Sequence, residues 1–527
     1  MNTPRVIFHI ARADFLERVR RYSFLVTMMF ALYLGYAAAT GVISIRLGDS
    51  RGLYTSAWIG TLMAVVTTTF AGTAGFYIVK NAIDRDRMTR VGEILAATPI
   101  RKRTYALGKF LSNFAVLESM VAVLALAAVA MKLIIREDPQ FNLWALWSPF
   151  IFLATPSMAI VAAIAVLFES VGWLGGGFGN VAYFFLWTFG ISTIAFAKSC
   201  WFDPFGVITV FTSMTPAAAA AIPDYRNNDF SITIETSPVK LVPSFRWQGI
   251  PWTWELILSR VMWFGIATLI AMAAALFFDR FDSAVIEAPK KKKIQTIEDS
   301  ESPANIARPQ SAGAIHLTPL DSRARGFNFF HLLIAELRLA LHGISWWWYL
   351  VAMGLVVGQL ASPQEISRGP LLGVAWLWPV LIWSAMGVRE SRNGTGQFIF
   401  SAARILPRQL PAYWMAGVVI AMASGSGAAI RLLLAGEIWG TAAWAAGALF
   451  IPTFALALGV WSGSSRPFEA LYAMLWYVGP LNRVPGFDFT GGADGALVAR
   501  YTCIYFMIAA GMLVAAFAGR ARQLRAG

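Results

Sequence analysis

The chain has 527 residues, 57% of them hydrophobic and 14% charged, whereas soluble domains carry about 25% charged residues. This balance excludes a soluble enzyme with a single anchor and indicates a polytopic membrane protein. The net charge of +14 is scattered between apolar runs. That distribution argues against nucleic-acid binding and is typical of cytoplasmic loops that face anionic lipid.

The cysteines and histidines argue against redox and metal chemistry. Cys200 and Cys503 belong to no CxxC pair, the four histidines lie far apart, and no HExxH motif occurs. We therefore predict no catalytic residue and no metal site in this chain. The N-terminus lacks a small-residue cleavage site after a short apolar core, so we expect its first apolar run to remain as a span.

Residues 1–21 are predicted to form a helix that lies in the cytoplasmic membrane interface. Apolar residues alternate there with arginines, as Ile7, Ile10, Phe15 and Val19 do with Arg12, Arg18, Arg20 and Arg21. A plain charged flank before the first span is the alternative.

Apolar runs long enough for a membrane helix, which needs about 20 residues, follow along the first half. They cover residues 22–43, 56–79, 105–131, 148–168, 180–197 and 254–278. With the N-terminus inside, the basic clusters of the chain fall on the cytoplasmic side. Residues 199–253 then form a long outer loop, and its prolines argue against one long helix.

The segment at residues 84–111, between the second and third spans, is strongly charged. Its apolar residues recur at helical spacing and its charged residues lie on other faces: Met88, Val91 and Leu95 against Arg87, Arg90 and Glu93. This pattern predicts a short amphipathic helix. Thr98-Pro99 ends it, because the residue before a proline is pushed out of the helical region. A second helix is expected to begin near Tyr105.

This segment resembles the loop between the second and third spans of ATP-binding-cassette (ABC) exporter permeases of the type-2 family. The resemblance rests on Gly92-Glu93, Thr98-Pro99, Arg101 and Leu107-Gly108-Lys109. It implies a coupling helix that contacts a separate ATPase subunit, with Arg90, Glu93, Thr98, Pro99 and Arg101 as coupling residues. The alternative is an ordinary cytoplasmic loop that obeys the positive-inside rule.

The composition changes at residues 280–326, which are polar and dotted with prolines, as is typical of a flexible cytoplasmic linker. The linker separates a first repeat at 1–279 from a second at 327–527. Spans of the second repeat are predicted at residues 346–360, 371–388, 410–434, 441–460, 468–480 and 500–518.

Short motifs of the first repeat recur in the second. Phe330-His331 with Glu336 echoes Phe8-His9 with Asp14, Gly396-Gln397 echoes Gly92-Glu93, Gly417 echoes Gly108, Phe468-Glu469-Ala470 echoes Phe168-Glu169-Ser170, and Trp476-Tyr477-Val478-Gly479 echoes Trp187-Thr188-Phe189-Gly190. Repeats of six spans in one orientation indicate a fused permease dimer. Gln397 is then the coupling residue of the second repeat.

Glu118 is the ionisable residue placed deepest in a predicted span. A charge at that depth costs at least roughly 2.5–3.5 kcal/mol, so such residues face the bundle interior or a cavity. We predict that Glu118 lines a translocation path. A buried structural hydrogen bond with Asn113, Ser119 or a neighbouring helix is the alternative.

The chain contains no G-x-x-x-x-G-K-[ST] motif and therefore no phosphate cradle. It is expected to bind no cofactor itself and to be no enzyme. The resemblance implies that ATP and Mg bind to the partner ATPase, present in two copies, one under each half.

Together these patterns predict an all-α polytopic membrane protein of about twelve transmembrane helices, in two repeats of six with amphipathic elbow and coupling helices. The resemblance implies the permease of an ABC exporter in a bacterial plasma membrane. It would move an unidentified substrate outward, with both termini cytoplasmic.

Two other classes stay open. An ion-coupled secondary transporter would need paired intramembrane carboxylates, and Glu118 alone is well placed. An integral-membrane lipid-linked transferase would need groups clustered at one membrane face. Asp203, Asp224 and Asp229 share one loop, but their spacing matches no metal site.

Overall fold

The computed structural model of the chain describes residues 3–20, 22–48, 50–135, 137–194, 199–221, 230–234, 243–278, 328–401, 405–484, 486–491 and 496–526. The predicted linker at 280–326 lies outside the described residues, as do Asp224 and Asp229 of the outer loop. The described chain is built almost entirely from helices, as the sequence predicted, with two small two-stranded sheets.

Six helical stretches of the described chain are long and apolar enough to cross a membrane. They are Ser56–Met88, Lys102–Ile134, Leu143–Ser170, Trp254–Phe277, Ile438–Ser462 and Val498–Arg525. Two bent pairs bring the number to eight if each pair is one span: Phe329–Leu341 with Trp346–Ala361, and Ile405–Ser424 with Ser426–Leu434. The chain is therefore a polytopic helical membrane protein.

The chain divides into two compact units. The first comprises Met1–Phe281 and Ser464–Asn482, and the second comprises Asp282–Gly463 and Arg483–Gly527. The sequence placed residues 464–482 in the second repeat, whereas the structure packs them into the first unit.

The helices of the first unit are α1 (Thr3–Val19), α2 (Tyr22–Ala39), α3 (Ser56–Val66), α4 (Gly72–Val79), α5 (Ala82–Met88), α6 (Val91–Ala96), α7 (Lys102–Ile134), α8 (Leu143–Pro149), α9 (Thr155–Ser170), α10 (Gly177–Ile194), α11 (Val207–Ala221), α12 (Trp254–Phe277) and α24 (Arg466–Trp476). A short 3₁₀ turn covers Cys200–Phe202. π-helical turns join α3 to α4 at Thr67–Ala71 and α8 to α9 at Phe150–Ala154. Each pair therefore runs as one nearly continuous helix.

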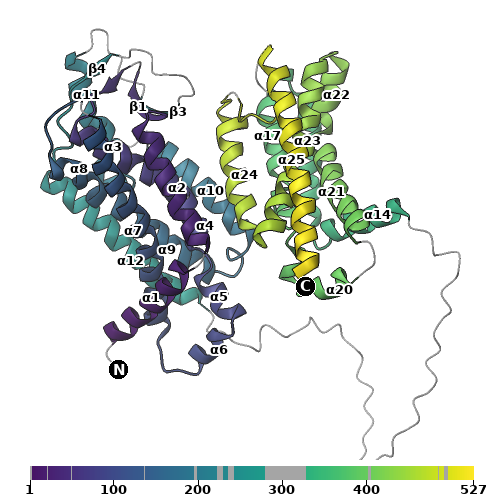
Figure 1. Ribbon diagram of the computed structural model, residues 1–527, viewed down its shortest axis with the longest axis horizontal. Helices are drawn as coiled ribbons and strands as arrows, with labels where there is room; N and C mark the ends of the chain where they lie inside the picture. The colour runs from purple at the N-terminus through teal and green to yellow at the C-terminus, as the bar shows by residue number, and fades with distance from the viewer. Residues whose placement is uncertain are drawn as a thin grey trace, which may run out of the picture. The chain divides into compact units, whose positions relative to one another are not determined.

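Helix α7 is the centre of the first unit, because it packs against α1, α2, α3, α9 and α12. Figure 1 shows α7, α9 and α12 side by side, with the strands at one end and α1, α5 and α6 at the other. Close approach at the α1 end depends on Gly108 of α7, since a Cβ there would lie 2.7 Å from Ile10 Cγ2. The N-terminal helix that the sequence predicted at the membrane interface is thus α1, and it packs against α7.

Two small sheets close the strand end of the first unit. β1 (Ile43–Leu47) pairs antiparallel with β3 (Phe230–Ile234), and β2 (Arg51–Gly52) pairs parallel with β4 (Ser244–Phe245). β3 and β4 lie within residues 199–253, which the sequence placed in a long outer loop. The short strands are stabilised by the buried Trp58 ring, which meets the rings of Phe245 and Trp247 edge to face.

An ion pair fastens this end to the loop after α7. Arg51 Nη2 lies 2.8 Å from Glu137 Oε1, and the backbone N–H of Tyr54 donates to Glu137 Oε2 at 3.0 Å. Partial burial would raise the pKa of Glu137, but these hydrogen bonds and the Arg51 charge lower it.

The helices of the second unit are α14 (Phe329–Leu341), α15 (Trp346–Ala361), α16 (Gln364–Ile366), α17 (Leu372–Leu377), α18 (Val380–Ser384), α19 (Arg389–Arg392), α20 (Gly396–Phe400), α21 (Ile405–Ser424), α22 (Ser426–Leu434), α23 (Ile438–Ser462) and α25 (Ala496–Ala526). A π-helical turn at Ser367–Leu371 joins α16 to α17. Figure 1 shows α21, α23 and α25 side by side, with α14 and α20 at one end. The predicted span at 371–388 is broken after Leu377, because Pro379 cannot donate a backbone hydrogen bond.

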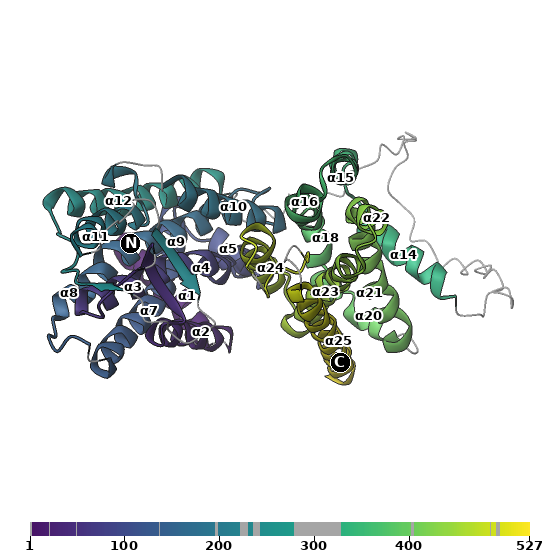
Figure 2. The same cartoon turned by 90° about the horizontal axis from the view of Figure 1, so that it is seen from above.

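Helix α24 packs against α4 and α10 of the first unit, and Figure 2 shows α24 beside α10. The rings of Phe184 and Phe185 in α10 meet the Trp476 ring of α24 edge to face. A π-helical turn, Tyr477–Leu481, extends α24. The predicted span at 468–480 is therefore helical, but it is shorter than the helices that are long enough to cross a membrane.

We expect Gly60→Ala to destabilise the first unit by about 1–3 kcal/mol through overpacking. A Cβ at Gly60 would overlap the carbonyl of Leu146 in α8, whereas a Cβ at Gly265 in α12 would meet no other element of the described chain within 4 Å. Thermal unfolding of the purified variants in detergent measures the difference. Gly265→Ala is the control and should unfold no earlier than the parent; equal melting temperatures for both variants would contradict this packing.

Candidate functional site: a buried ion network beneath an exposed segment

The segment between the second and third spans contains two short helices, α5 and α6, where the sequence predicted one. Thr89 Oγ1 donates to the carbonyl of Arg85 and closes α5. Arg90 then takes the left-handed conformation with φ of 58°, which a continuous helix does not allow. The prediction of a single amphipathic helix was therefore wrong, because the positive φ of Arg90 interrupts the helix between α5 and α6.

The predicted end of the segment is confirmed. Helix α6 ends at Ala96, and Thr98 Oγ1 donates to the carbonyl of Leu95 at 2.7 Å just before Pro99. The next helix, α7, begins at Lys102 rather than near Tyr105.

The tip of the segment exposes apolar and charged side chains together. Met88, Val91 and Ile94 are 68%, 42% and 69% exposed. Arg90 and Glu93 beside them are exposed too. The sequence had placed Met88 and Val91 on a common face with Leu95, but only Leu95 packs against the core. The outer surface is therefore mixed rather than purely polar.

Each predicted coupling residue lies on or near this surface. Arg90 precedes α6, Glu93 is in its first turn, Thr98 and Pro99 follow it, Arg101 precedes α7, and Gln397 lies on α20 of the second unit. All are exposed except Thr98, which is half-buried. The structure brings the first five together on one segment.

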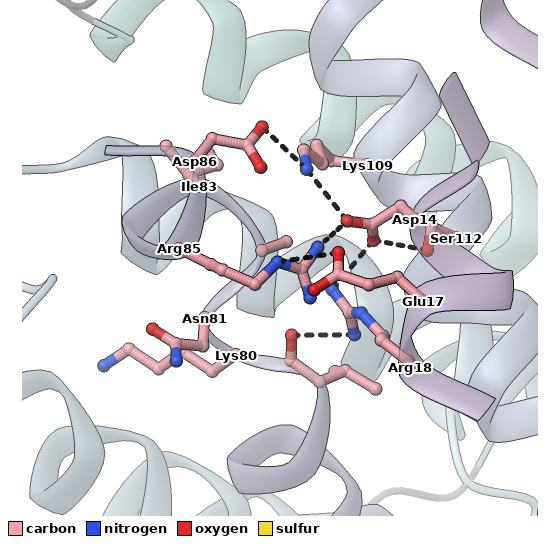
Figure 3. A network of polar contacts seen from close by, with 12 residues as sticks. Asp14, Glu17, Arg18, Lys80, Asn81, Ile83, Arg85, Asp86, Lys109 and Ser112 are labelled. Atoms are coloured by element: carbon pink, nitrogen blue, oxygen red, sulfur yellow. Dashed lines mark hydrogen bonds and ion pairs between the residues drawn. The ribbon is translucent and has the colours of Figure 1, made fainter. Parts of the chain in front are cut away.

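Asp14 of α1 binds the buried side of this segment (Figure 3). Asp14 Oδ1 pairs with Arg85 of α5 and lies 2.9 Å from Lys109 Nζ of α7. Asp14 Oδ2 accepts a hydrogen bond from Ser112 Oγ at 2.5 Å and lies 3.1 Å from Arg18 Nη2. One carboxylate, 6% exposed, therefore ties α1, α5 and α7 together.

The network continues along α5. Lys109 Nζ lies 2.8 Å from Asp86 Oδ2, which also accepts from the Tyr105 hydroxyl at 2.7 Å. Arg85 Nε lies 3.2 Å from Glu17 Oε2. Three carboxylates thus face three cations, which offsets the cost of burying each ion.

Glu169, at the end of α9, holds the other end of α5. Its carboxylate accepts hydrogen bonds from the backbone N–H groups of Asn81, Ala82 and Ile83. Unpaired N–H groups and the helix dipole favour an anion at a helix N-terminus. Helix α5 is therefore fixed at its start by α9 and along its length by α1 and α7.

The second unit holds its corresponding segment in a similar way. Glu336 of α14 pairs with Arg389 of α19, and Gln409 Nε2 of α21 donates to Glu336 Oε1 at 3.3 Å. Glu390, which follows Arg389 in the chain, places its Oε2 3.3 Å from Arg520 Nη2 of α25. In both units, an acidic residue of the first helix (α1 or α14) thus pairs with an arginine at the start of the exposed segment.

These contacts refine the expected motif matches. Arg85 precedes Gly92 by the same offset as Arg389 precedes Gly396, and Asp14 and Glu336 are equivalent partners. Gly417 does not take the place of Gly108, because it lies against Met386 and Pro452 instead of the leading helix.

Another expected match also fails. Phe168-Glu169 ends α9, whereas Phe468-Glu469 opens α24. These two motifs therefore lie at different places in their helices, although their letters agree.

Arg466 of α24 contacts the residues just before α5 in the first unit. Its guanidinium donates to the carbonyl of Lys80 at 3.0 Å and to Asn81 Oδ1 at 2.6 Å. Asn180 of α10 donates to Glu469 of α24 and accepts from Lys80 Nζ at 2.6 Å. Helix α24 therefore contacts the residues from which α5 begins.

Glu118 lies on α7, where its Oε2 accepts from Thr155 Oγ1 of α9 at 3.2 Å. Its Oε1 is buried without a hydrogen-bond partner in the described chain, and the same holds for both amide atoms of Asn113. Ser119 donates to the carbonyl of Val116. The hydrogen bond of Glu118 thus goes to a neighbouring helix, and its place on a path stays a prediction.

Sequence reasoning missed the partners of these carboxylates: Arg85 and Lys109, which are buried, and Arg389 and Gln409, which are half-buried. The signal was the matching offset of Asp14 and Glu336, acidic residues within mostly apolar and basic helices. Among the described residues, no group of three or more His, Cys, Asp or Glu could hold a metal ion.

No protein-family model matches this chain, and no curated protein matches it either. Its long apolar helices show that the chain is a multi-span helical membrane protein.

We expect Asp14→Asn to destabilise the protein by about 3–5 kcal/mol, because it leaves buried cations without their carboxylate. Thermal unfolding in detergent and the amount of protein in the membrane measure the loss. Glu17→Gln is the matched control: its side chain is 48% exposed, so its ion pair contributes about 0–1 kcal/mol. Equal losses in the two variants would show that the network does not hold the segment.

We expect Arg466→Met to loosen α5, because Lys80 and Asn81 lose their donor while α5 itself is unchanged. Hydrogen exchange of the peptide that covers residues 82–88, followed by mass spectrometry, should speed up. Arg466→Lys should restore part of the protection, and Arg500→Met, an exposed arginine of α25, should leave it unchanged. Identical exchange in Arg466→Met and the parent would rule out this contact as a support of α5.

Proposed function

We propose that this chain is the permease of an ABC-type exporter, driven by ATP that a separate ATPase subunit hydrolyses. The observation that carries the proposal is the repeated anchoring of an exposed segment. Asp14 pairs with Arg85 beneath α5 and α6, and Glu336 pairs with Arg389 beneath α19 and α20. A docking surface that transmits force needs such an anchor in each half.

The anchoring explains how motion could pass from a partner into the membrane helices. A force on the tip at Met88, Val91 and Ile94 reaches α5, which is bonded to α1, α7 and α9. Because packed interiors are close to rigid, displacement of the tip is transmitted rather than absorbed. Buried ion pairs resist separation better than exposed ones, since water does not replace them.

The proposal includes the finer architecture expected from the sequence: two half-permeases with six spans each, and twelve spans in all. It places both termini on the cytoplasmic side of a bacterial plasma membrane, with one ATPase copy under each half. ATP and Mg bind to that partner, and Glu118 lines the path of the exported substrate.

The two halves are not expected to couple equally. In the second unit a neutral amide, Gln409, stands where Lys109 meets the carboxylate. Gln397 likewise replaces Glu93 on the exposed surface. Lys109 adds the attraction of a second charge to its hydrogen bond with the carboxylate, whereas Gln409 is an uncharged donor, so the second segment is held less firmly.

We expect Glu93→Lys to weaken binding of the ATPase or its stimulation by substrate, while insertion stays normal. Glu93 lies outside the apolar spans, and reversing its charge changes the surface without touching the buried network. The measurement is the cassette ATPase that co-purifies with each variant from the native host, together with its hydrolysis rate. Gln397→Lys, the matched change on the other segment, should have the smaller effect.

Full recovery and full stimulation with Glu93→Lys would remove Glu93 from the coupling contact. If no cassette ATPase binds the parent protein, the permease assignment itself is wrong.

A further inference from the structure

The second unit contains a cavity of about 240 Å³ near the joint of α14 and α15. The two helices meet there at 107°. Helices α18 and α21 complete the wall, and its apolar lining includes Leu339, Ile344, Trp348, Ile382 and Ile420.

Water is a poor occupant of the apolar part of this cavity. A buried water needs two to four polar partners, and an engineered apolar cavity of about 150 Å³ stays dry and binds benzene. The indole N–H of Trp383, which lines the cavity, is already bonded to the carbonyl of Gly417 at 3.1 Å. The carbonyl of Trp348 accepts from Trp378 Nε1 at 3.2 Å.

The cavity reaches the surface where apolar side chains are exposed. Leu339 and Leu381 line it and are themselves 53% and 40% exposed. On the same two helices that meet at the joint, Ile334 of α14 and Leu350 of α15 are also exposed. In a polytopic membrane protein such a surface faces acyl chains, so whatever enters the cavity comes from the bilayer.

The lining of the cavity also includes two polar residues. These are Arg389 and Tyr413, and the Arg389 guanidinium stacks 4.7 Å from the centre of the Tyr413 ring. The guanidinium carries five N–H donors, and its Nη2 serves Glu336. It can therefore keep its ion pair and still donate to ester oxygens of a lipid.

The joint lies where an acyl chain of the bilayer would begin. A helix that turns by about a right angle into a span, as α14 does into α15, runs along the membrane interface, at the boundary between head groups and acyl chains. An acyl chain inserted at this depth can lie along the apolar lining with its ester end near Arg389.

We propose that this cavity binds one acyl chain of a membrane glycerophospholipid, with the ester end of that chain near Arg389. The lipid fills the angle between α14 and α15 and fixes it. This site does not depend on the exporter assignment, since it needs only the bilayer.

The test is native mass spectrometry of the full chain purified in a mild detergent, with bound phospholipid counted per protein. The parent should retain one phospholipid. Ala416→Phe fills the cavity from α21, where Ala416 is a buried lining residue, and should lower retention by about tenfold or more, equivalent to at least roughly 1.4 kcal/mol of binding free energy. Ala423→Phe is the matched control, because Ala423 is exposed on the same helix, and it should retain the lipid as the parent does.

A second, smaller substitution tests the cavity in case Ala416→Phe does not fold. Ala340→Leu enlarges a half-buried lining residue on α14 and should also reduce retention, with the melting temperature reported beside it. Reconstitution into vesicles of brominated phosphatidylcholine gives an independent reading, because Trp348 and Trp383 line the cavity and should be quenched less in Ala340→Leu. The proposal is overturned if the parent retains no phospholipid, or if the folded filling variants retain as much lipid as the parent.

Discussion

The buried carboxylate of Asp14 is the contact on which the exposed segment of the first unit depends. It is shared by Arg18, Arg85, Lys109 and Ser112, which come from three helices. Each ion would be costly to bury alone, so the arrangement is stable only when all its partners are in place. The position of α5 relative to α1 and α7 is thus set by charge balance as well as by apolar packing.

The second unit keeps the geometry of this contact with weaker chemistry. Glu336 has a cation, Arg389, and an amide, Gln409, where Asp14 has two arginines and a lysine. Compensation comes from Arg520 of the last helix, which pairs with Glu390. The segment of the second unit is therefore tied to α25 as well as to its leading helix.

The helical composition and most helix positions could be predicted from the sequence, because an apolar run of about 20 residues in a chain this hydrophobic is nearly always a membrane helix. Proline marked the end of α6 correctly, since its effect on the preceding residue is local. The breaks at Arg90 and Trp378–Pro379, by contrast, fell inside patterns that still looked continuous.

The partners of the buried network could not be read from the sequence. Asp14 and Arg85 are far apart along the chain, and periodicity within one helix carries no information on which side chain it will meet. The echo of Asp14 in Glu336 pointed to the right acidic residues without identifying their cations. The echo of Glu169 in Glu469 misled, because a three-residue likeness does not fix the place in a helix.

The position of α24 has a consequence for biogenesis. Residues 464–482 complete a unit whose other residues end near 281, so the ribosome has made most of the chain before that unit can close. Until then, Lys80 and Asn180 lack the neighbours that α24 brings them. Contacts between such distant residues form slowly, because a long loop must be closed first. During synthesis, the unit made first is therefore among the last to be finished, and its unclosed face is the one that a membrane chaperone would have to protect.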